Sequence, residues 1–254
     1  MREDFTAQVE TLTACPVCYA PFGDEYEAPD VSKAFEFGGN NRLAYYHCEA
    51  CGAYALNPRM TDEYTRVYYS RAYRAEVVPV DIVTKLQHIS RVGEQMRLVG
   101  DLLVGKTLLE LGCSSGYFLR ELVERGFSVT GVDPDKRIDE DENTRWYRDI
   151  ADLPPEPFDI IAMSHVMEHF NHPREMLEVL VKSYARAGTR VMIDVPNVDG
   201  CYPAGLWLPH HPVVWGADGL RWLLEVVGCK VIFEDTHGNG LPAPHNLLMV
   251  GEVL

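Results

Sequence analysis

The sequence predicts an α/β fold in which a mostly parallel sheet follows a small N-terminal metal-binding ribbon. From residue 105 onward, short apolar segments with the spacing of buried strands alternate with segments of helical periodicity. Parallel strands need a crossover connection, usually a helix, so this alternation favours a parallel sheet. Two Cys-x-x-Cys pairs precede that region. We therefore expect a ribbon over 1–58, a helical linker or lid over 59–104, and a ligand-binding domain over 105–254.

The composition agrees with a compact globular protein and argues against two classes of partner. The chain has 254 residues, of which 46% are hydrophobic, enough for one sizeable domain and a small appendage. No stretch approaches the roughly 18 apolar residues that span a bilayer, and the first residues lack the pattern of a signal peptide. The net charge of −15 opposes binding to the phosphates of nucleic acid. We expect a cytoplasmic location and neither a membrane nor a nucleic-acid partner.

The ribbon prediction depends on the four cysteines of the two Cys-x-x-Cys pairs. Two such knuckles have the spacing of a four-thiolate zinc site, whereas disulfides are disfavoured in a reducing cytoplasm and a redox Cys-x-x-Cys would not come twice. His47 is surplus to this set and is expected to be an ordinary strand residue. Residues 34–46 predict an aromatic-rich hairpin between the knuckles. The expected ligands of a structural zinc ion are Cys15, Cys18, Cys48 and Cys51.

Two helices are predicted between the ribbon and the α/β domain. Thr61 is a candidate N-cap of the first, in which tyrosines recur at helical spacing. An apolar stripe predicts the second over 82–103. We expect the tyrosines to pack against the core, with Tyr69 or Tyr73 as part of a lid over a ligand as the alternative.

The remaining elements follow one another as a parallel sheet requires. The segment 134–143 is short and strongly acidic, so we expect a shortened or irregular connection there. Strands are expected at 107–111, 128–132, 145–148, 158–163, 190–195, 229–235 and 246–253. Helices are expected at 115–125, 173–187 and 217–227.

The segment 107–118 indicates the class of ligand. It combines a buried strand, a glycine turn and the start of a helix, and the next strand ends at Asp133. Gly112 and Gly116 let the backbone approach a ligand closely, and Asp133 can accept hydrogen bonds from both hydroxyls of a ribose. A dinucleotide would need Gly-x-Gly-x-x-Gly, because a pyrophosphate rests on bare amides. Here an acidic residue, Glu110, precedes only two glycines, which favours a nucleoside without a pyrophosphate.

The pattern Glu110-x-Gly112-x-x-x-Gly116 resembles the nucleotide loop of class I S-adenosylmethionine-dependent methyltransferases, and the resemblance extends from about residue 60 to the C-terminus. It implies a Rossmann-like sheet of seven strands in the order 3-2-1-4-5-7-6 and S-adenosyl-L-methionine as cofactor. In that family the acidic residue at the strand end faces the cationic half of the cofactor. One position departs from the pattern, because Ser114 stands where glycine is usual. The cofactor-binding residues implied by the resemblance are Glu110, Gly112, Cys113, Ser114, Gly116, Tyr117, Asp133, Pro134, Asp149, Ser164 and His165.

A second group of polar residues follows the strand predicted at 158–163. Ser164 and His165 begin the loop at its carboxyl end, where open α/β sheets bind ligands. They are expected to border the methionine part of the cofactor. Glu168-His169, followed by a helix that starts with proline, resembles the same segment of many small-molecule methyltransferases.

Histidines are the candidate bases. Methyl transfer is an in-line displacement, so the protein must align the acceptor and, for a hydroxyl, remove its proton. Histidine suits that task because its pKa lies close to working pH. The candidates are His211, His169 and His165, and His211 lies with His210 in an apolar loop expected to cap the acceptor pocket. Because related ribbon-bearing enzymes act on sugar nucleotides, polysaccharide precursors and natural products, the resemblance implies a small polar metabolite methylated on oxygen.

Three alternatives remain open. Nitrogen or carbon could be the acceptor atom. Glu168, His169, His172 and either His210 or His211 could hold a metal ion, which resembles the family that methylates RNA 3′ ends on the 2′-hydroxyl; that family has a glutamate where this chain has His165. The chain could also be a catalytically silent scaffold that binds a nucleoside and docks a partner through its ribbon.

Overall fold

The computed structural model of this chain describes residues 9–22, 25–26, 44–69, 82–135, 138–200, 208, 210–238 and 245–254. Within these ranges no helix is both long and apolar enough to cross a membrane.

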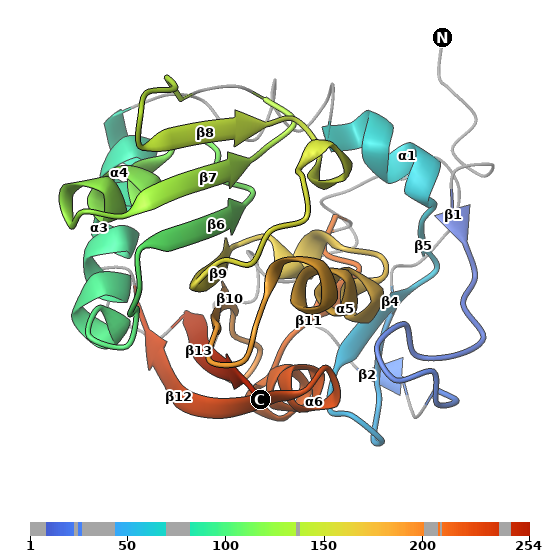
Figure 1. Cartoon of the computed structure of the whole chain (residues 1–254). Helices are drawn as coiled ribbons and strands as arrows, with labels where there is room; N and C mark the ends of the chain where they lie inside the picture. Colours follow the sequence, from blue (N-terminus) through green and yellow to red (C-terminus); the bar gives the residue numbers. More distant parts are fainter. Residues whose placement is uncertain are drawn as a thin grey trace, which may run out of the picture.

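A seven-stranded sheet forms the centre of the molecule (Figure 1). Its spatial order is β8-β7-β6-β9-β10-β13-β12, and β13 runs antiparallel to both of its neighbours while the other strands run parallel to one another. Numbered along the chain, this order is 3-2-1-4-5-7-6, which confirms the predicted α/β, Rossmann-like fold. The strands are β6 (Thr107–Leu111), β7 (Ser128–Val132), β8 (Thr144–Tyr147), β9 (Ile160–Ser164), β10 (Arg190–Pro196), β12 (Cys229–His237) and β13 (Asn246–Val253).

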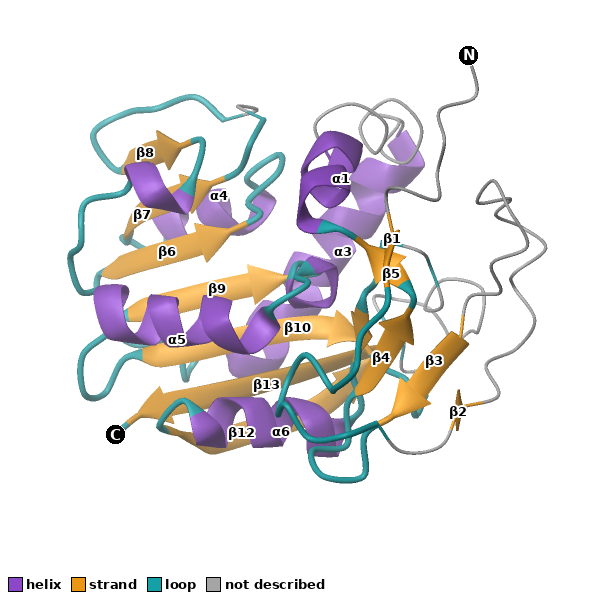
Figure 2. Cartoon of the chain, turned by 90° about the vertical axis from the view of Figure 1, so that its right-hand side faces the viewer, coloured by secondary structure: helices purple, strands orange, loops and turns teal. Residues whose placement is uncertain are grey.

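Helices cover both faces of this sheet (Figure 2). Alternate residues of one strand point to opposite faces. In β9, Ile161 packs into the core that contains α5 and α6, whereas Ile160 packs into the core that contains α3 and α4. Both faces are therefore apolar, as expected for a sheet of parallel strands. The helices are α3 (Ile82–Val99), α4 (Tyr117–Glu124), α5 (Pro173–Tyr184) and α6 (Ala217–Val226).

The predicted helices were correct in position and slightly too long. The helix predicted at 115–125 begins at Tyr117, because Ser114 and Gly116 have φ values of 46° and 67°, which a right-handed helix does not allow. Thr61 caps α1 (Asp62–Val67) as predicted, since its side chain accepts a hydrogen bond from the Tyr64 N–H. The described residues of 134–143 contain no helix, so the connection between β7 and β8 is irregular, as expected.

A smaller four-stranded sheet, in the order β11-β4-β3-β2, forms the ribbon. Its edge strand β11 comes from beyond residue 200 and pairs antiparallel with β4. The first strand and the turn of the hairpin predicted at 34–46 lie outside the described residues, as does Tyr73. The strands are β2 (Glu25–Tyr26), β3 (Ala44–His47), β4 (Tyr54–Asn57) and β11 (Val213–Val214), with a separate pair of β1 (Val9–Glu10) and β5 (Arg59–Met60).

The ribbon packs directly on the first turn of α6. A Cβ atom on Gly52 would lie 3.0 Å from Asp218 Cβ and 3.1 Å from the Gly219 nitrogen, so the two backbones meet without intervening side chains. Cys48 and Cys51 belong to the same hydrophobic core as Leu220 of α6. The ribbon and the α/β domain therefore share one core.

Candidate active site

The structure brings the predicted cofactor residues together at the carboxyl ends of adjacent strands. The glycine turn follows β6, Asp133 follows β7, and Ser164 and His165 lie at the end of β9. The Ser114 N–H donates to Asp133 Oδ2 over 3.0 Å, which places the carboxylate against the turn. The C-terminal edge of a parallel sheet is where such folds bind their ligands.

The turn after β6 is shaped by its backbone. Gly112 has φ 68°, and a Cβ there would lie 2.2 Å from Val166 Cγ2, so only glycine fits. Ser114 has φ 46°, so serine occupies a left-handed conformation at the position where it departs from the family pattern.

Glu110 is the most desolvated acidic group of this turn. It is 4% exposed, and its Oε2 atom has no hydrogen-bond partner within the described part of the chain. Burial, with a contribution from Asp133, raises its pKa to about 8. Burial, followed by Glu110 and Asp133, also raises the pKa of the neighbouring Cys113 thiol, which is therefore not a nucleophile. An unpaired buried carboxylate is suited to a cationic ligand group, and in this respect the residues present fit S-adenosylmethionine.

Three predicted cofactor residues lie farther from the turn or are already engaged. The ring of Tyr117, the first residue of α4, lies under Arg120 and edge-on to His88. The Pro134 carbonyl accepts a hydrogen bond from Arg148. Asp149 is exposed and caps the short helix η4 (Ile150–Asp152) through the Ala151 N–H. Their contacts with a cofactor stay a prediction.

A buried polar network beside Ser164 was missed at the sequence level. Gln95 of α3 donates to Ser164 Oγ over 2.8 Å and to Asp194 Oδ2 over 2.6 Å. Asp194 and His237 are both almost fully buried and share a contact of 3.1 Å. In the sequence, the signal for this network is Asp194, an aspartate within the apolar run of β10. The network ties α3 to the ends of β9, β10 and β12.

A cluster of histidines surrounds Glu168 next to this network. His165 follows β9, and Glu168 and His169 lie in the short helix η5 (Met167–His169). The rings of His169 and His211 lie 4.8 Å apart, as do those of His210 and His211. Nδ1 of His169 lies 2.6 Å from the Tyr69 hydroxyl and 3.0 Å from the His210 carbonyl. Three predicted bases, His165, His169 and His211, therefore lie in one cluster, and Tyr69 packs against it.

Burial controls the charge of this cluster. It lowers the pKa of His165 well below its ordinary value, with further lowering by Arg91 and neighbouring histidines. Burial lowers the pKa of His169 to about 4, although hydrogen bonds to the His210 and His165 backbone oppose the shift. Burial also lowers the pKa of His210 to about 3. Burial also raises the pKa of Glu168 to about 8. These imidazoles are neutral at physiological pH, the form that accepts a proton or binds a metal.

The ribbon holds the segment that carries His211. The Tyr45 hydroxyl of β3 lies 2.9 Å from the carbonyl of Leu208 and 2.9 Å from that of His211. The Leu56 N–H of β4 donates to the Pro212 carbonyl over 2.9 Å. Trp207, which belongs to the same apolar loop, lies outside the described residues, whereas Trp215 is fully buried. Trp215 therefore packs in the core and does not line an open pocket.

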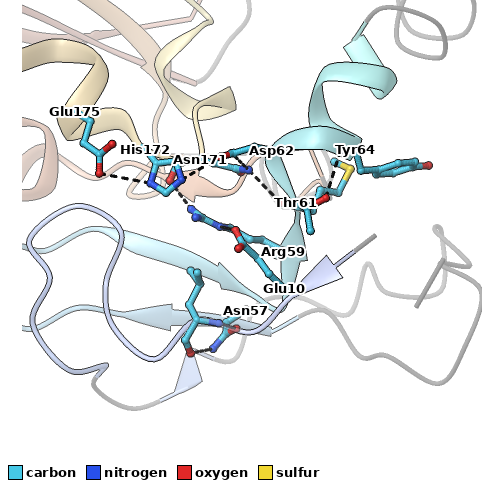
Figure 3. A network of polar contacts seen from close by, with 11 residues as sticks. Glu10, Asn57, Arg59, Thr61, Asp62, Tyr64, Asn171, His172 and Glu175 are labelled. Carbon is cyan, nitrogen blue, oxygen red and sulfur yellow. Dashed lines mark hydrogen bonds and ion pairs between the residues drawn. The ribbon is translucent and has the colours of Figure 1, made fainter. Parts of the chain in front are cut away.

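His172 belongs to a different network, which joins the β1–β5 pair to α5 (Figure 3). Its ring faces Asp62 at 3.4 Å and Glu175 at 3.8 Å. In the same network, buried Arg59 pairs with Glu10 and donates to the Asn171 carbonyl. The alternative in which His172 joins a metal set with Glu168 is therefore not supported, because His172 is the N-cap residue of α5 and directs its ring to these carboxylates.

The four ribbon cysteines converge as predicted. Cys15, Cys18, Cys48 and Cys51 form one group that could hold a metal ion. The Sγ atoms of Cys15 and Cys51 lie 3.7 Å apart, and those of Cys18 and Cys48 lie 3.4 Å apart. Tetrahedral zinc with bonds of about 2.3 Å separates its sulfur ligands by about 3.8 Å. The hydrogen bond from Cys51 lowers the pKa of the Cys15 thiol to about 5, which favours a thiolate. This group could hold zinc.

Comparison with known proteins identifies the family. Residues 86–234 match a family described as a methyltransferase domain. The chain belongs to this family. Among curated methyltransferases, the ubiquinone biosynthesis O-methyltransferase of Idiomarina loihiensis is 29% identical over 132 residues, 47% of this chain and 54% of that protein. The enzyme of the same name from Aeromonas salmonicida is 25% identical over 108 residues, 37% of this chain and 45% of that protein. The chain thus spans about half the length of the curated relatives it matches.

Solved methyltransferases share the fold at lower identity. The 1,6-didemethyltoxoflavin-N1-methyltransferase of Burkholderia thailandensis, with bound 1,6-didemethyltoxoflavin and S-adenosylhomocysteine, is 17% identical with a TM-score of 0.63, and the match covers 84% of this chain and 96% of that one. Magnesium protoporphyrin IX methyltransferase of Synechocystis PCC 6803, with bound S-adenosylhomocysteine, is 16% identical with a TM-score of 0.56. This match covers 76% of this chain and 100% of that one. These likenesses support the class I methyltransferase fold.

Proposed function

We propose that this protein transfers a methyl group from S-adenosyl-L-methionine to an oxygen of a small polar metabolite, such as a sugar nucleotide or a natural-product intermediate. The observation that carries the proposal is the contact between Ser114 and Asp133, which sets a carboxylate against a glycine turn at the carboxyl edge of the sheet. A ribose placed beside that turn would meet the Asp133 carboxylate.

The electrostatics of the turn favour this cofactor over a dinucleotide. The Asp133 carboxylate would repel a pyrophosphate, and the raised pKa of buried Glu110 means that it would stay protonated beside one. A cationic ligand favours the ionised form of Glu110, so both carboxylates could then attract the ammonium and sulfonium groups of S-adenosylmethionine. When bound, this cofactor supplies a methyl carbon that the sulfonium has already activated.

His165 is the proposed proton acceptor. It follows β9, and its Nε2 atom is buried and has no hydrogen-bond partner in the part of the chain that the structure describes. The acceptor hydroxyl would be aligned with the methyl carbon that the bound cofactor would supply, and His165 would take the hydroxyl proton. The curated relatives are named as O-methyltransferases, which supports oxygen as the acceptor atom. His169 and His211 lie in the same cluster, with their rings 4.8 Å apart.

Calorimetric titration tests the cofactor half of this proposal. We expect S-adenosylhomocysteine to bind with one site per chain and NAD⁺ not to bind. Binding of NAD⁺ in place of S-adenosylhomocysteine would contradict the proposal. Binding of neither ligand would also contradict it and would favour a silent scaffold.

A labelled-methyl assay tests the reaction half. Protein, S-adenosylmethionine carrying a labelled methyl group and a panel of sugar nucleotides and hydroxylated metabolites are incubated, and products are located by mass spectrometry and NMR. We expect O-methylated product, and His165→Ala should lower kcat about 100-fold or more with little change in cofactor affinity. N- or C-methylated product would correct the acceptor atom and leave the cofactor assignment intact.

A further inference from the structure

We infer that Glu168, His169 and His211 form a binding site for a divalent metal ion beyond the carboxyl end of β9, separate from the four-cysteine site. The inference deepens the proposed function, on which its catalytic role rests. One ligand atom from each residue lies within 4.8 Å of those of the other two. Metal–ligand bonds of about 2.1 Å bring ligand atoms within about 4.2 Å of one another, so small side-chain adjustments are enough to close the site.

Glu168 supplies the independent observation that points to a cation. Its side chain is 2% exposed, and neither carboxylate oxygen has a hydrogen-bond partner among the described residues. The nearest imidazole nitrogens, His165 Nδ1 and His169 Nε2, lie 3.6 Å and 3.9 Å from Oε1, too far for a hydrogen bond. A buried carboxylate without donors is strongly unfavourable unless it is paired or coordinates a metal.

The contacts of His169 hold its ring in the tautomer that binds metal. The His210 carbonyl can only accept, so its contact of 3.0 Å with His169 Nδ1 places the proton on Nδ1. The Tyr69 hydroxyl lies 2.6 Å from the same nitrogen and donates to the His210 carbonyl over 3.1 Å. The lone pair is then on Nε2, the nitrogen on the Glu168 side. Metal-binding histidines usually donate their other N–H to a carbonyl in this way.

His211 reaches the site from a separate part of the chain. The ribbon fixes its backbone through Tyr45 and through the bond from Leu56 to Pro212. Ligands from η5 and from a segment pinned by β-structure would therefore converge on one point, which is a preorganised arrangement.

The ligand chemistry indicates the class of ion and of acceptor. Two imidazoles and a carboxylate suit Zn²⁺, Mn²⁺, Co²⁺ or Fe²⁺, and three protein ligands leave open positions. An acceptor with two adjacent oxygens, such as a vicinal diol or a hydroxy-carbonyl, could chelate the ion there. Coordination would lower the pKa of the hydroxyl, so that a weak base suffices to remove its proton.

A proton is the competing occupant of this site. Glu168 has a raised pKa, so a neutral carboxylic acid could fill the gap between the imidazoles, and the nearby charge of Arg91 also acts against a cation. Metal titration distinguishes these two occupants, because a site filled by a proton alone takes up no metal at neutral pH.

The experiment is a Mn²⁺ titration of zinc-loaded protein, with free Mn²⁺ followed by electron paramagnetic resonance. Mn²⁺ prefers oxygen and imidazole ligands to thiolates, so the four-cysteine group does not compete. We expect saturable binding of one ion per chain, lost in Glu168→Gln and His211→Ala. The Tyr69→Phe change should weaken binding about 10- to 100-fold. Glu175→Gln and His172→Ala alter a similar but exposed carboxylate–imidazole pair and should leave binding unchanged.

Titration with S-adenosylhomocysteine is performed on every variant to show that the fold persists. Absence of saturable Mn²⁺ binding in the unaltered protein, or its persistence in Glu168→Gln, would overturn the metal inference. If S-adenosylhomocysteine still binds in that case, the proposed function stands without the metal. If it does not bind, the proposed function itself has failed.

Discussion

The Ser114 N–H donates a hydrogen bond of 3.0 Å to Oδ2 of Asp133. The other carboxylate oxygen, Oδ1, accepts from the Asp135 N–H over 2.8 Å. Asp133 thus links the turn after β6 to the segment after β7 before any ligand is present. Backbone donors hold the carboxylate in place, so its orientation is fixed.

Replacing Asp133 with asparagine should weaken cofactor binding. The amide keeps the size of the side chain and one acceptor oxygen but loses the charge and half of the acceptor capacity. We expect the affinity for S-adenosylhomocysteine to fall roughly 10- to 100-fold, because a hydrogen bond to a charged group contributes about 1.5–3 kcal/mol. Calorimetry provides the measurement. Asp141→Asn, on the same acidic segment but exposed, is the matched control, and equal affinities in the two variants would contradict the role of Asp133.

Glu110 should make both stability and cofactor binding depend on pH. Its pKa is raised from 4.5 to about 8 in the folded protein, so between these values the folded state holds a proton that the unfolded state has lost. Its contribution to the free energy of unfolding therefore falls as pH rises through this window, by about 1.4 kcal/mol per pH unit. Urea unfolding from pH 5 to 8 should show a steeper loss for the unaltered protein than for Glu110→Gln.

Calorimetry in buffers of different ionisation enthalpy provides a second readout for Glu110. A cationic cofactor favours the carboxylate, so binding at pH 7 should release about one proton per site. Glu110→Gln should bind without that release. Identical proton release in both proteins would show that Glu110 does not face the cationic half of the cofactor.

Loss of the ribbon metal should destabilise the whole chain. Cys48 and Cys51 belong to the core that includes α6, so Cys48→Ser should remove zinc and loosen the α/β domain as well. We expect the free energy of unfolding to fall by more than about 4 kcal/mol, the range reached when a structural metal is lost. Metal analysis and thermal unfolding check this. Cys229→Ser, a buried cysteine outside the group, should keep its zinc, and normal unfolding of zinc-free Cys48→Ser would contradict a structural role.

Gly112→Ala should damage the turn after β6. The new Cβ would lie 2.2 Å from Val166 Cγ2, and φ 68° is itself unfavourable for alanine by about 1–2 kcal/mol. We expect reduced stability and weaker binding of S-adenosylhomocysteine. The double variant with Val166→Ala should recover only part of both losses, since it removes the clash and leaves the backbone strain. Full recovery would mean that the clash alone matters.

The sheet and the turn at its edge could be predicted because they depend on local patterns. Thr107–Leu111 and Ser128–Val132 are apolar strands bounded by turn residues, and a parallel sheet brings their carboxyl ends together whatever the rest of the chain does. This geometric rule alone predicts that Gly112, Asp133 and His165 lie at the same edge of the sheet.

The contacts that could not be predicted join residues far apart in the chain. Gln95 lies on a helix whose docking decides that it meets Asp194, and no local pattern encodes that docking. His172 is close to Glu168 in the sequence, but at the start of α5 its ring lies against Asp62. The pairing of β11 with β4 is likewise set by tertiary packing. The sequence therefore indicated where the site lies, but not which element holds each side chain.

The bond from Tyr45 to the His211 carbonyl connects residues 166 positions apart and leads to the last prediction. Burial raises the Tyr45 pKa, so the hydroxyl stays protonated and donates. Tyr45→Phe would leave the buried carbonyl of His211 and the partly buried carbonyl of Leu208 without this donor, at a cost of about 1–3 kcal/mol. We expect stability, Mn²⁺ affinity and kcat to fall while affinity for S-adenosylhomocysteine is kept, because the glycine turn is untouched. Tyr46→Phe, at the adjacent position of β3, is the matched control. If Tyr45→Phe kept its kcat and Mn²⁺ affinity, the ribbon would stabilise the chain without positioning His211.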